Sequence, residues 1–223
     1  MNQKKTPQLI IFDLDGTLVN SLPDIANAIN ETLGERGGAP LDLDAVREKV
    51  GDGPRKLVER AFPDSSPGDI DPIVRRYLEI YEKHSGRVAT LMPGAQELLD
   101  SLSGRTLAVV TNKITRFAID NLEKLGIAGR FSAILGFDCG LPVKPAPDCL
   151  LHIAAAMKIK PSGCAMVGDG LPDIGAGKAA GMLTCAILGG FGDPVELKRL
   201  EPDIAVQTMG DLIPVFCPGG DPH

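Results

Sequence analysis

The clearest hydrophobic pattern lies near the start of the chain, where four large apolar residues, Leu9 to Phe12, follow one another without a polar residue. Such a run, stopped by the carboxylate of Asp13, is typical of a short strand that is buried on both faces of a parallel sheet. A half-exposed strand would alternate apolar and polar residues instead. Further strands are predicted from comparable apolar runs at 106–111, 131–135, 164–169, 184–188 and 204–206.

Helical spacing of apolar residues fills the intervals between the later strands. Helices are predicted at 94–102, 115–125, 147–157 and 173–180. Two of them are followed by a glycine suited to a C-terminal cap, Gly126 and Gly181. Strands that alternate with helices are typical of a doubly wound parallel sheet, so the predicted fold class is α/β.

The segment between the first two strands has a different pattern, with four helical stretches and no convincing strand. Its helices are predicted to begin at Ser21, Asp42, Arg55 and Asp71, with a turn-rich break at 63–68. The first strand must therefore connect across a purely helical segment to rejoin its sheet. This pattern predicts an all-helical cap at 21–86, inserted into an α/β core that comprises 1–20 and 87–223.

The charge and the aromatic content of the chain bear on which classes of partner it can bind. The formal net charge is −6, aromatic residues make up 4% of the chain, and Trp is absent. A negative field and few stacking rings disfavour nucleic acid and anionic membranes as partners. We therefore expect a soluble protein that binds neither, and its oligomeric state is left open between monomer and homodimer.

The five cysteines contain no Cys-x-x-Cys pair, and their number is odd. Neither a cysteine metal site nor a disulfide framework is therefore favoured, and free thiols in a reducing compartment are the simple interpretation. The N-terminal apolar run is too short for a signal-peptide core or a membrane span. A cytoplasmic location is the resulting expectation.

Polar side chains that can carry chemistry follow the predicted strands. They are Asp13, Asp15, Thr111, Lys144, Asp169 and Asp173. Because the carboxyl ends of parallel strands meet at one edge of a sheet, we expect these side chains to converge. Two carboxylates at ~3.5 Å repel by about 5 kcal/mol at an effective dielectric constant of ~20, so a divalent cation is expected among them. Magnesium suits such oxygen ligands.

These residue types suit phosphoryl transfer through an aspartate that forms an acyl phosphate. Mg²⁺ would be held by the carboxylates of Asp13 and Asp169 and by a backbone carbonyl near Asp15. Lys144 would neutralise the nucleophile and the phosphate, while Thr111 would donate its hydroxyl to a phosphate oxygen. Asp15 would protonate the leaving alcohol and then take a proton from the hydrolytic water. The expected substrate is a small phosphorylated metabolite.

Four motifs in this order resemble those of the haloacid dehalogenase superfamily, in its phosphatase branch. They are Asp13-Leu14-Asp15-Gly16-Thr17-Leu18, Thr111-Asn112-Lys113, Lys144-Pro145-Ala146-Pro147 and Gly168-Asp169-Gly170-Leu171-Pro172-Asp173. The resemblance implies that Asp13 is the nucleophile, Asp15 the acid/base and Asp169 a magnesium ligand. It implies that Asp173 orients magnesium-bound waters or Lys144, and that the helical insert closes over the substrate. The metal site is thus expected at Asp13, Asp15, Asp169 and Asp173.

Within that superfamily the chain looks most like the phosphoglycolate phosphatases. The features that carry this are Thr111-Asn112-Lys113 and two cap motifs, Val50-Gly51-Asp52-Gly53 and Leu57-Val58-Glu59-Arg60-Ala61. This resemblance implies 2-phosphoglycolate as the substrate. Arg55 and Lys56 follow the cap loop, where they are either solvated helix charges or contacts for a substrate carboxylate, and Arg55 is the candidate for that contact. The substrate-binding residues are expected to be Gly51, Gly53, Arg55 and Asn112. The chain departs from the common pattern at Ile114, Gly170 and Leu171-Pro172, which bears on magnesium contacts and on substrate identity.

Other functions fit parts of the same pattern. A sugar-phosphate phosphatase, or a mutase resembling β-phosphoglucomutase, would use the same scaffold, and the mutase would not accumulate free phosphate. A signalling receiver also uses an aspartate, magnesium, a Thr and a Lys, but it needs a lasting acyl phosphate and no cap. A dehalogenase would have no use for the acid/base that Asp15 supplies.

Overall fold

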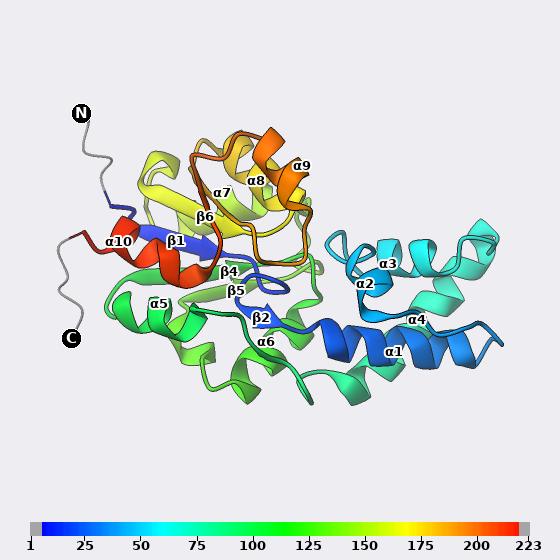
Figure 1. The fold of residues 1–223 in the computed structure, drawn as a ribbon. Coiled ribbons are helices and arrows are strands. Elements are labelled where there is room, and N and C mark those ends of the chain that lie inside the picture. Colours follow the sequence, from blue (N-terminus) through cyan, green and yellow to red (C-terminus); the bar gives the residue numbers. More distant parts are fainter. Residues whose placement is uncertain (1–5, 219–223) are drawn as a thin grey trace.

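The computed structural model describes residues 6–218, and its centre is a six-stranded sheet (Figure 1). The strands lie in the order β5-β4-β1-β6-β7-β8, and every neighbouring pair is parallel. Their bounds are Leu9–Phe12 (β1), Thr106–Val110 (β4), Ala133–Leu135 (β5), Cys164–Gly168 (β6), Leu183–Ile187 (β7) and Ile204–Val206 (β8). The six predicted strands are confirmed, and their ends agree to within two residues.

Helices cover both faces of this sheet. They are α5 (Ala95–Ser101), α6 (Thr115–Lys124), α7 (Asp148–Ala156) and α8 (Leu171–Ala180). Ile10 and Phe12 of β1 share one hydrophobic cluster with residues of α5 and α6. Leu9 and Ile11 share another with residues of α7 and α8. The four-residue apolar run is therefore buried on both sides, and the doubly wound α/β fold is confirmed.

The strand order changes direction at β1. Strands β4 and β5 lie on one side of it, and β6, β7 and β8 lie on the other. In open parallel sheets, ligands bind beyond the carboxyl ends of the strands at such a point. Asp13 directly follows β1 and Asp169 directly follows β6, so the crevice between these two neighbouring strands is where a ligand is expected.

Four helices between β2 and β3 extend beyond one end of the sheet and form an all-helical cap (Figure 1). They are α1 (Leu22–Gly34), α2 (Leu43–Arg47), α3 (Pro54–Ala61) and α4 (Pro67–His84). The cap has its own hydrophobic cluster, with Ile29, Val58 and Ile73 fully buried in it. Phe117 of α6 belongs to the same cluster, so the cap packs against one helix of the core. The residue limits 21 and 86 stay a prediction.

The chain leaves the sheet domain for the cap and returns from it through a small antiparallel pair. Val19–Asn20 (β2) pairs with Thr90–Leu91 (β3). Neither strand was predicted, because two residues are too few to show an alternating pattern. The pair brings the two connections of the cap side by side.

Helix α4 begins at Pro67 and runs through Pro72, whereas the sequence pattern predicted its start at Asp71. Proline is well suited to the first helical turn, where its missing N–H is not needed. Ile70 is buried in the cap cluster, and this packing favours the earlier start. Short elements without a predicted counterpart are α9 (Pro194–Arg199), α10 (Ile213–Phe216) and the 3₁₀ turns at Ala128–Arg130, Pro161–Gly163 and Met209–Leu212.

No disulfide bond joins the five cysteines, all of which lie within residues 6–218. Among the helices within residues 6–218, none combines the length and the apolar character that crossing a bilayer requires.

Candidate active site

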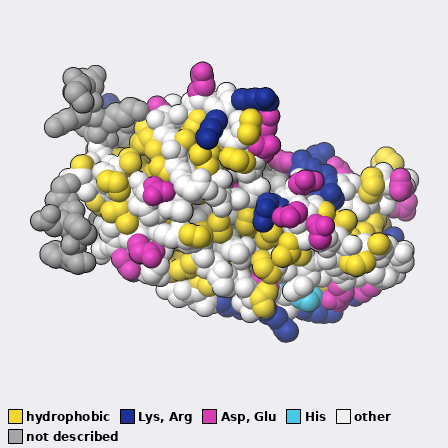
Figure 2. Space-filling view, in the orientation of Figure 1, with side chains coloured by type: hydrophobic (Ala, Val, Ile, Leu, Met, Phe, Trp, Pro, Cys, Tyr) yellow, Lys and Arg dark blue, Asp and Glu magenta, His cyan; other side chains and the backbone are white. Residues whose placement is uncertain are grey.

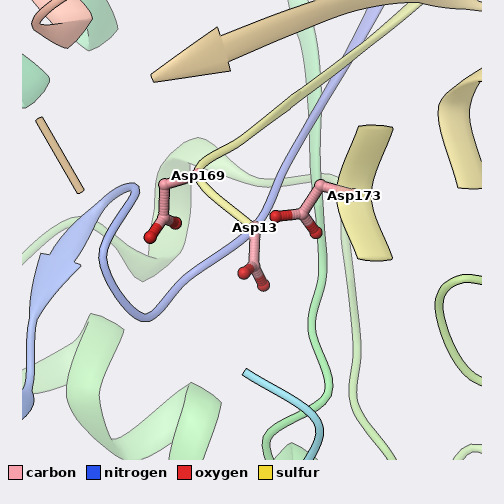
Figure 3. A group of neighbouring side chains, drawn as sticks. All are labelled: Asp13, Asp169 and Asp173. Atoms are coloured by element: carbon pink, nitrogen blue, oxygen red, sulfur yellow. The ribbon is translucent and has the colours of Figure 1, made fainter. Parts of the chain in front are cut away.

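Three carboxylates gather at the carboxyl edge of the sheet. Asp13 follows β1, Asp169 follows β6 and Asp173 lies in the first turn of α8, and one oxygen from each lies within 4.8 Å of the others (Figure 3). Asp169 and Asp173 are buried. The strand order thus brings together three residues that are up to 160 positions apart in the chain, from 13 to 173.

Lys144 supplies a positive charge to this acidic cluster. Its Nζ lies 2.8 Å from Asp13 Oδ1 and donates a hydrogen bond of 2.6 Å to Asp173 Oδ1. Burial alone would lower the pKa of Lys144, but the charges of Asp13 and Asp173 outweigh burial and raise this pKa above its usual value. Lys144 is therefore held as an ammonium ion between two carboxylates.

One lysine does not balance three carboxylates. Burial and the charges of Asp13 and Asp173 raise the pKa of Asp169 to about 8. Burial and the charge of Asp13 also raise the pKa of Asp173, against the opposing effect of Lys144. The cluster resists full ionisation, and a divalent cation would remove this deficit of positive charge. Clustered carboxylate oxygens are the donors that Mg²⁺ prefers, so these residues fit that ion.

The loops around Asp169 hold its carboxylate from two sides. Thr17 Oγ1 donates a hydrogen bond to Oδ1, and the backbone N–H of Phe191 donates one of 2.7 Å to Oδ2. Two glycines allow this close approach. A Cβ atom at Gly16, whose φ is +83°, would lie 2.2 Å from Asp169 Oδ2, and one at Gly190 would lie 2.2 Å from Asp169 Cβ. Sequence reasoning assigned no site role to Thr17 or Phe191.

The side chain of Asp15 contacts a different set of partners from Asp13. Its oxygens accept hydrogen bonds from Lys113 Nζ at 2.9 and 3.1 Å, and Oδ1 accepts another from Ser21 Oγ at 2.5 Å. Asp15 is absent from the described three-carboxylate cluster, which leaves its backbone carbonyl as the expected contribution to a metal site. The two aspartates of the first motif are therefore held for different tasks.

Lys113 is a site residue to which sequence reasoning gave no role. Its side chain is 6% exposed, and its Nζ lies 4.8 Å from the centre of the Tyr81 ring in the cap. Burial would lower the pKa of Lys113, but the charge of Asp15 and the Tyr81 side chain outweigh burial and raise it. The signal that could have found Lys113 is its position three residues after the end of β4, at the same sheet edge as Asp15.

An inner cavity of about 70 Å³ lies between the core and the cap. Asp13, Asp15 and Thr111 line it on the core side, and Gly51 and Gly53 line it on the cap side. Its other lining residues are mainly apolar or aromatic: Ile25, Val50, Pro54, Leu57, Tyr77, Leu78, Tyr81, Asn112, Lys113, Ile114 and Phe117. A small group bound here would contact both predicted catalytic aspartates.

Asn112 connects the cap to the core at this cavity. Its Nδ2 donates hydrogen bonds of 3.1 Å to the carbonyl oxygens of Gly51 and Lys144. A Cβ atom at Gly53 would lie 3.2 Å from the Asn112 carbonyl oxygen, so the cap loop approaches the core closely. The Oδ1 atom of Asn112 is buried without a hydrogen-bond partner among the described residues. It is an acceptor that a bound molecule can use.

An outer groove of about 940 Å³ meets the inner cavity at Asp13 and Asp15. It is lined by Asp169 and Asp173 on the core side and by residues of the cap, among them Arg47 and Arg60. Arg47 pairs with Asp44, and Arg60 pairs with Asp52. Figure 2 shows such basic and acidic side chains intermingled over α2 and α3. The groove therefore carries no concentrated positive charge from the cap.

Arg55 does not lie where the sequence analysis expected it. It is exposed on α3, where it pairs with Glu59 and Asp71 of the cap. Within residues 6–218 it lines neither cavity. The reason is the helical phase of α3, which turns Leu57 and Val58 inward and Arg55 outward. The expected contact between Arg55 and a substrate carboxylate is not supported by this position.

A family model described as haloacid dehalogenase-like hydrolase matches residues 10–187. The chain belongs to this family. The matched region of this haloacid dehalogenase-like hydrolase runs from β1 to β7 and includes Asp13, Lys144, Asp169 and Asp173. Both the resemblance and the fold inferred from the motifs are thereby confirmed.

Individual relatives agree with the family assignment. A phosphoglycolate phosphatase from Psychrobacter arcticus is 37% identical over 216 residues, which are 92% of this chain and 94% of that protein. A phosphoglycolate phosphatase from Neisseria meningitidis is 39% identical over 216 residues, 92% of each chain. Among solved structures, a predicted phosphoglycolate phosphatase from Haemophilus somnus has a TM-score of 0.88 at 29% identity and covers 95% of this chain and 98% of its own.

Proposed function

We propose that this hydrolase is a magnesium-dependent phosphomonoesterase that converts 2-phosphoglycolate to glycolate and phosphate through a phosphoaspartate intermediate. Its relatives of similar length are named phosphoglycolate phosphatases, and they support a phosphatase. The observation that carries the mechanism is the position of Lys144, whose Nζ lies 2.8 Å from Asp13 Oδ1. A lysine bound to one carboxylate oxygen leaves the other free to attack an anion.

The first step would be an attack of Asp13 Oδ2 on the phosphorus atom. The new P–O bond makes an acyl phosphate on Asp13, and the bond between phosphorus and the leaving oxygen breaks. Lys144 remains at Oδ1 and offsets part of the negative charge that collects on the phosphoryl oxygens. Asp173 accepts a hydrogen bond from the same ammonium group and fixes its direction.

Asp15 would act as the general acid and general base. It gives a proton to the leaving oxygen in the first step, and in the second step it takes one from the water that hydrolyses the acyl phosphate. Its hydrogen bonds from Lys113 and Ser21 orient the carboxyl group two residues from the nucleophile. Thr111 lines the same cavity and would donate its hydroxyl to a phosphoryl oxygen.

Asp13, Asp169 and Asp173 would hold the magnesium ion, together with the backbone carbonyl near Asp15. When bound, the ion supplies two positive charges that offset the repulsion between these carboxylates and the phosphate. Burial and the charges of Asp13 and Asp173 together raise the pKa of Asp169 to about 8, and a bound cation would oppose both effects. The cytoplasmic location and the monomeric or homodimeric state belong to the same proposal.

The experiment is phosphate release from a panel of phosphomonoesters, measured with Mg²⁺ and with a chelator. We expect the highest kcat/KM for 2-phosphoglycolate and no turnover in the chelator. Asp13→Asn should abolish turnover and leave the circular dichroism spectrum unchanged, since it removes the nucleophile and not the core. Turnover by the folded Asn variant would exclude Asp13 as the nucleophile.

The same panel separates the alternatives. A sugar-phosphate phosphatase would prefer hexose phosphates, and a mutase would consume a sugar phosphate without accumulating free phosphate. Acid-quench labelling separates the signalling receiver, because a phosphoaspartate that lasts for minutes would favour the receiver. A leaving group held in the inner cavity of about 70 Å³ would be smaller than a hexose, whereas the outer groove of about 940 Å³ could take a larger one.

A further inference from the structure

The inner cavity contains a buried ammonium group that the three-carboxylate cluster does not contact. Lys113 lines the cavity, and its Nζ lies 4.8 Å from the centre of the Tyr81 ring, which lines the cavity from the cap. Among the described residues that line this cavity, Lys113 is the one Lys or Arg side chain. A second negative charge on a substrate that binds in this cavity, with its phosphate at Asp13, would find its counter-charge here.

The contacts of Lys113 leave room for a second anion. Its ammonium group donates two hydrogen bonds to one carboxylate, that of Asp15, and its other polar neighbour is the side chain of Tyr81, which carries no charge at neutral pH. Ser21 also donates to Asp15, so Asp15 keeps a partner if Lys113 is shared. The neighbouring lining residues Ile114 and Phe117 are apolar, and an ion pair is stronger away from water.

We propose that Lys113 binds the carboxylate of the substrate's leaving group, which lies in the inner cavity with its phosphate at Asp13. The inference rests on the proposed function and specifies its substrate class as a short phosphorylated carboxylate. A cavity of about 70 Å³ is several times the ~10–15 Å³ that one water needs, so it has room for a carboxymethyl group. Lys113 then takes the role that the sequence analysis assigned to Arg55.

The outer groove is the alternative binding site for the leaving group. Its cap cations are Arg47 and Arg60, whose side chains are 46% and 40% exposed. Each already pairs with an acidic neighbour, and Arg60 also donates to the Lys49 carbonyl oxygen. Exposed, paired guanidinium groups discriminate weakly for a carboxylate. The buried position of Lys113 is the better site for recognition.

The test compares two phosphate esters of nearly equal size. 2-Phosphoglycolate carries a carboxylate at the position where 2-hydroxyethyl phosphate carries an uncharged hydroxymethyl group. Lys113→Gln should lower the ratio of their kcat/KM values by roughly tenfold to a hundredfold, the range of a charged hydrogen bond. Any effect of the variant on Asp15 acts on both esters and cancels in the ratio. Lys113→Arg should preserve most of the ratio, because it keeps the charge.

Lys56→Gln is the matched control, since Lys56 is an exposed cap lysine that pairs with Glu59 and lines neither cavity. Its ratio should equal that of the wild type. Binding to the Mg²⁺-loaded protein is a second readout. Lys113→Gln should weaken 3-phosphonopropionate, a non-hydrolysable carboxylated analogue, and leave propylphosphonate unchanged in calorimetry.

Two results would overturn the inference. Equal losses for both esters in Lys113→Gln would make Lys113 a positioning residue for Asp15 alone, and a ratio that collapses in Arg60→Gln would place the carboxylate in the outer groove. A wrong proposed function would give a different result from a wrong role for Lys113. The wild-type enzyme itself would then prefer uncharged or sugar phosphate esters to 2-phosphoglycolate. The wild-type panel therefore tests the function, and the variant ratio tests Lys113.

Discussion

The hydroxyl of Thr17 donates a hydrogen bond to Oδ1 of Asp169, although the two residues are 152 positions apart in the chain. Both residues are buried. The bond joins the turn after β1 to the end of β6, across the crevice where the acidic cluster lies. It fixes the direction of a carboxylate that is expected to bind the metal, and such supporting contacts tune metal affinity.

Replacing Thr17 with Val should weaken Mg²⁺ binding by roughly tenfold to a hundredfold, because Asp169 loses the donor that orients it. The variant should also lose ~1–3 kcal/mol of unfolding free energy, since a buried acceptor is left without its partner. Calorimetric Mg²⁺ titration and urea unfolding measure the two effects. Thr17→Ser, which keeps the hydroxyl, is the control. Wild-type Mg²⁺ affinity in the Val variant would remove this hydrogen bond from the metal site.

Mg²⁺ affinity should rise with pH between 6 and 8. Burial and the charges of Asp13 and Asp173 raise the pKa of Asp169 from 3.8 to about 8 in the absence of metal, so the native protein binds this proton more tightly than the unfolded chain does. Between these two values, Asp169 therefore lowers the stability of the metal-free protein as pH increases.

A bound cation must displace the proton, which links its affinity to pH. We expect an increase of up to about tenfold per pH unit from one released proton, levelling off above pH 8. Calorimetry at several pH values, in buffers that differ in ionisation enthalpy, counts that proton. An affinity that is flat from pH 6 to 8 would show that Asp169 is already ionised.

Replacing Gly168 with Ala should disturb the active site directly, because the added methyl group would meet Asp173. A Cβ atom there would lie 2.3 Å from Cγ of Asp173, which is buried and has no space to retreat. Gly168→Ala is expected to cost ~1–3 kcal/mol of unfolding free energy and to lower kcat, because Asp173 loses its contact with Lys144. Gly129→Ala is the matched control, since nothing lies within 4 Å of its added Cβ. Equal stability and kcat in the two variants would contradict the prediction.

Ser21 should matter for turnover more than for helix stability. Its side chain makes no capping bond to α1, and its Oγ donates to Asp15 instead. Ser21→Ala should lower kcat by roughly tenfold, the value of one ordinary hydrogen bond to the acid/base group. A pH–rate profile shows whether the loss arises at Asp15.

Asp42→Ala provides the contrast to Ser21→Ala. Asp42 accepts a hydrogen bond from Ala45 N and caps α2. Its loss should cost ~0.5–2 kcal/mol of unfolding free energy and leave kcat unchanged. If Ser21→Ala behaves like Asp42→Ala, Ser21 is only a structural residue.

The sequence alone determined those features that depend on near neighbours in the chain. The run from Leu9 to Phe12 has no polar residue, so its strand could be assigned to the interior of a parallel sheet without other information. The apolar spacing of the helices follows the helical period of about 3.6 residues, and the polar residues after each strand stand directly beside it in the sequence. The general rule for parallel strand ends then indicated that Asp13, Lys144 and Asp169 would meet, and the structure brings them together.

Only the tertiary structure decided which partner each side chain contacts, because those contacts depend on distances in space between residues remote in the chain. Asp15 and Lys113 are 98 positions apart, and no periodic pattern links them. The outward direction of Arg55 follows from the rotation of α3 against the rest of the cap. A strand pair as short as β2 and β3 exists because the two chain connections of the cap meet there, which local spacing cannot express.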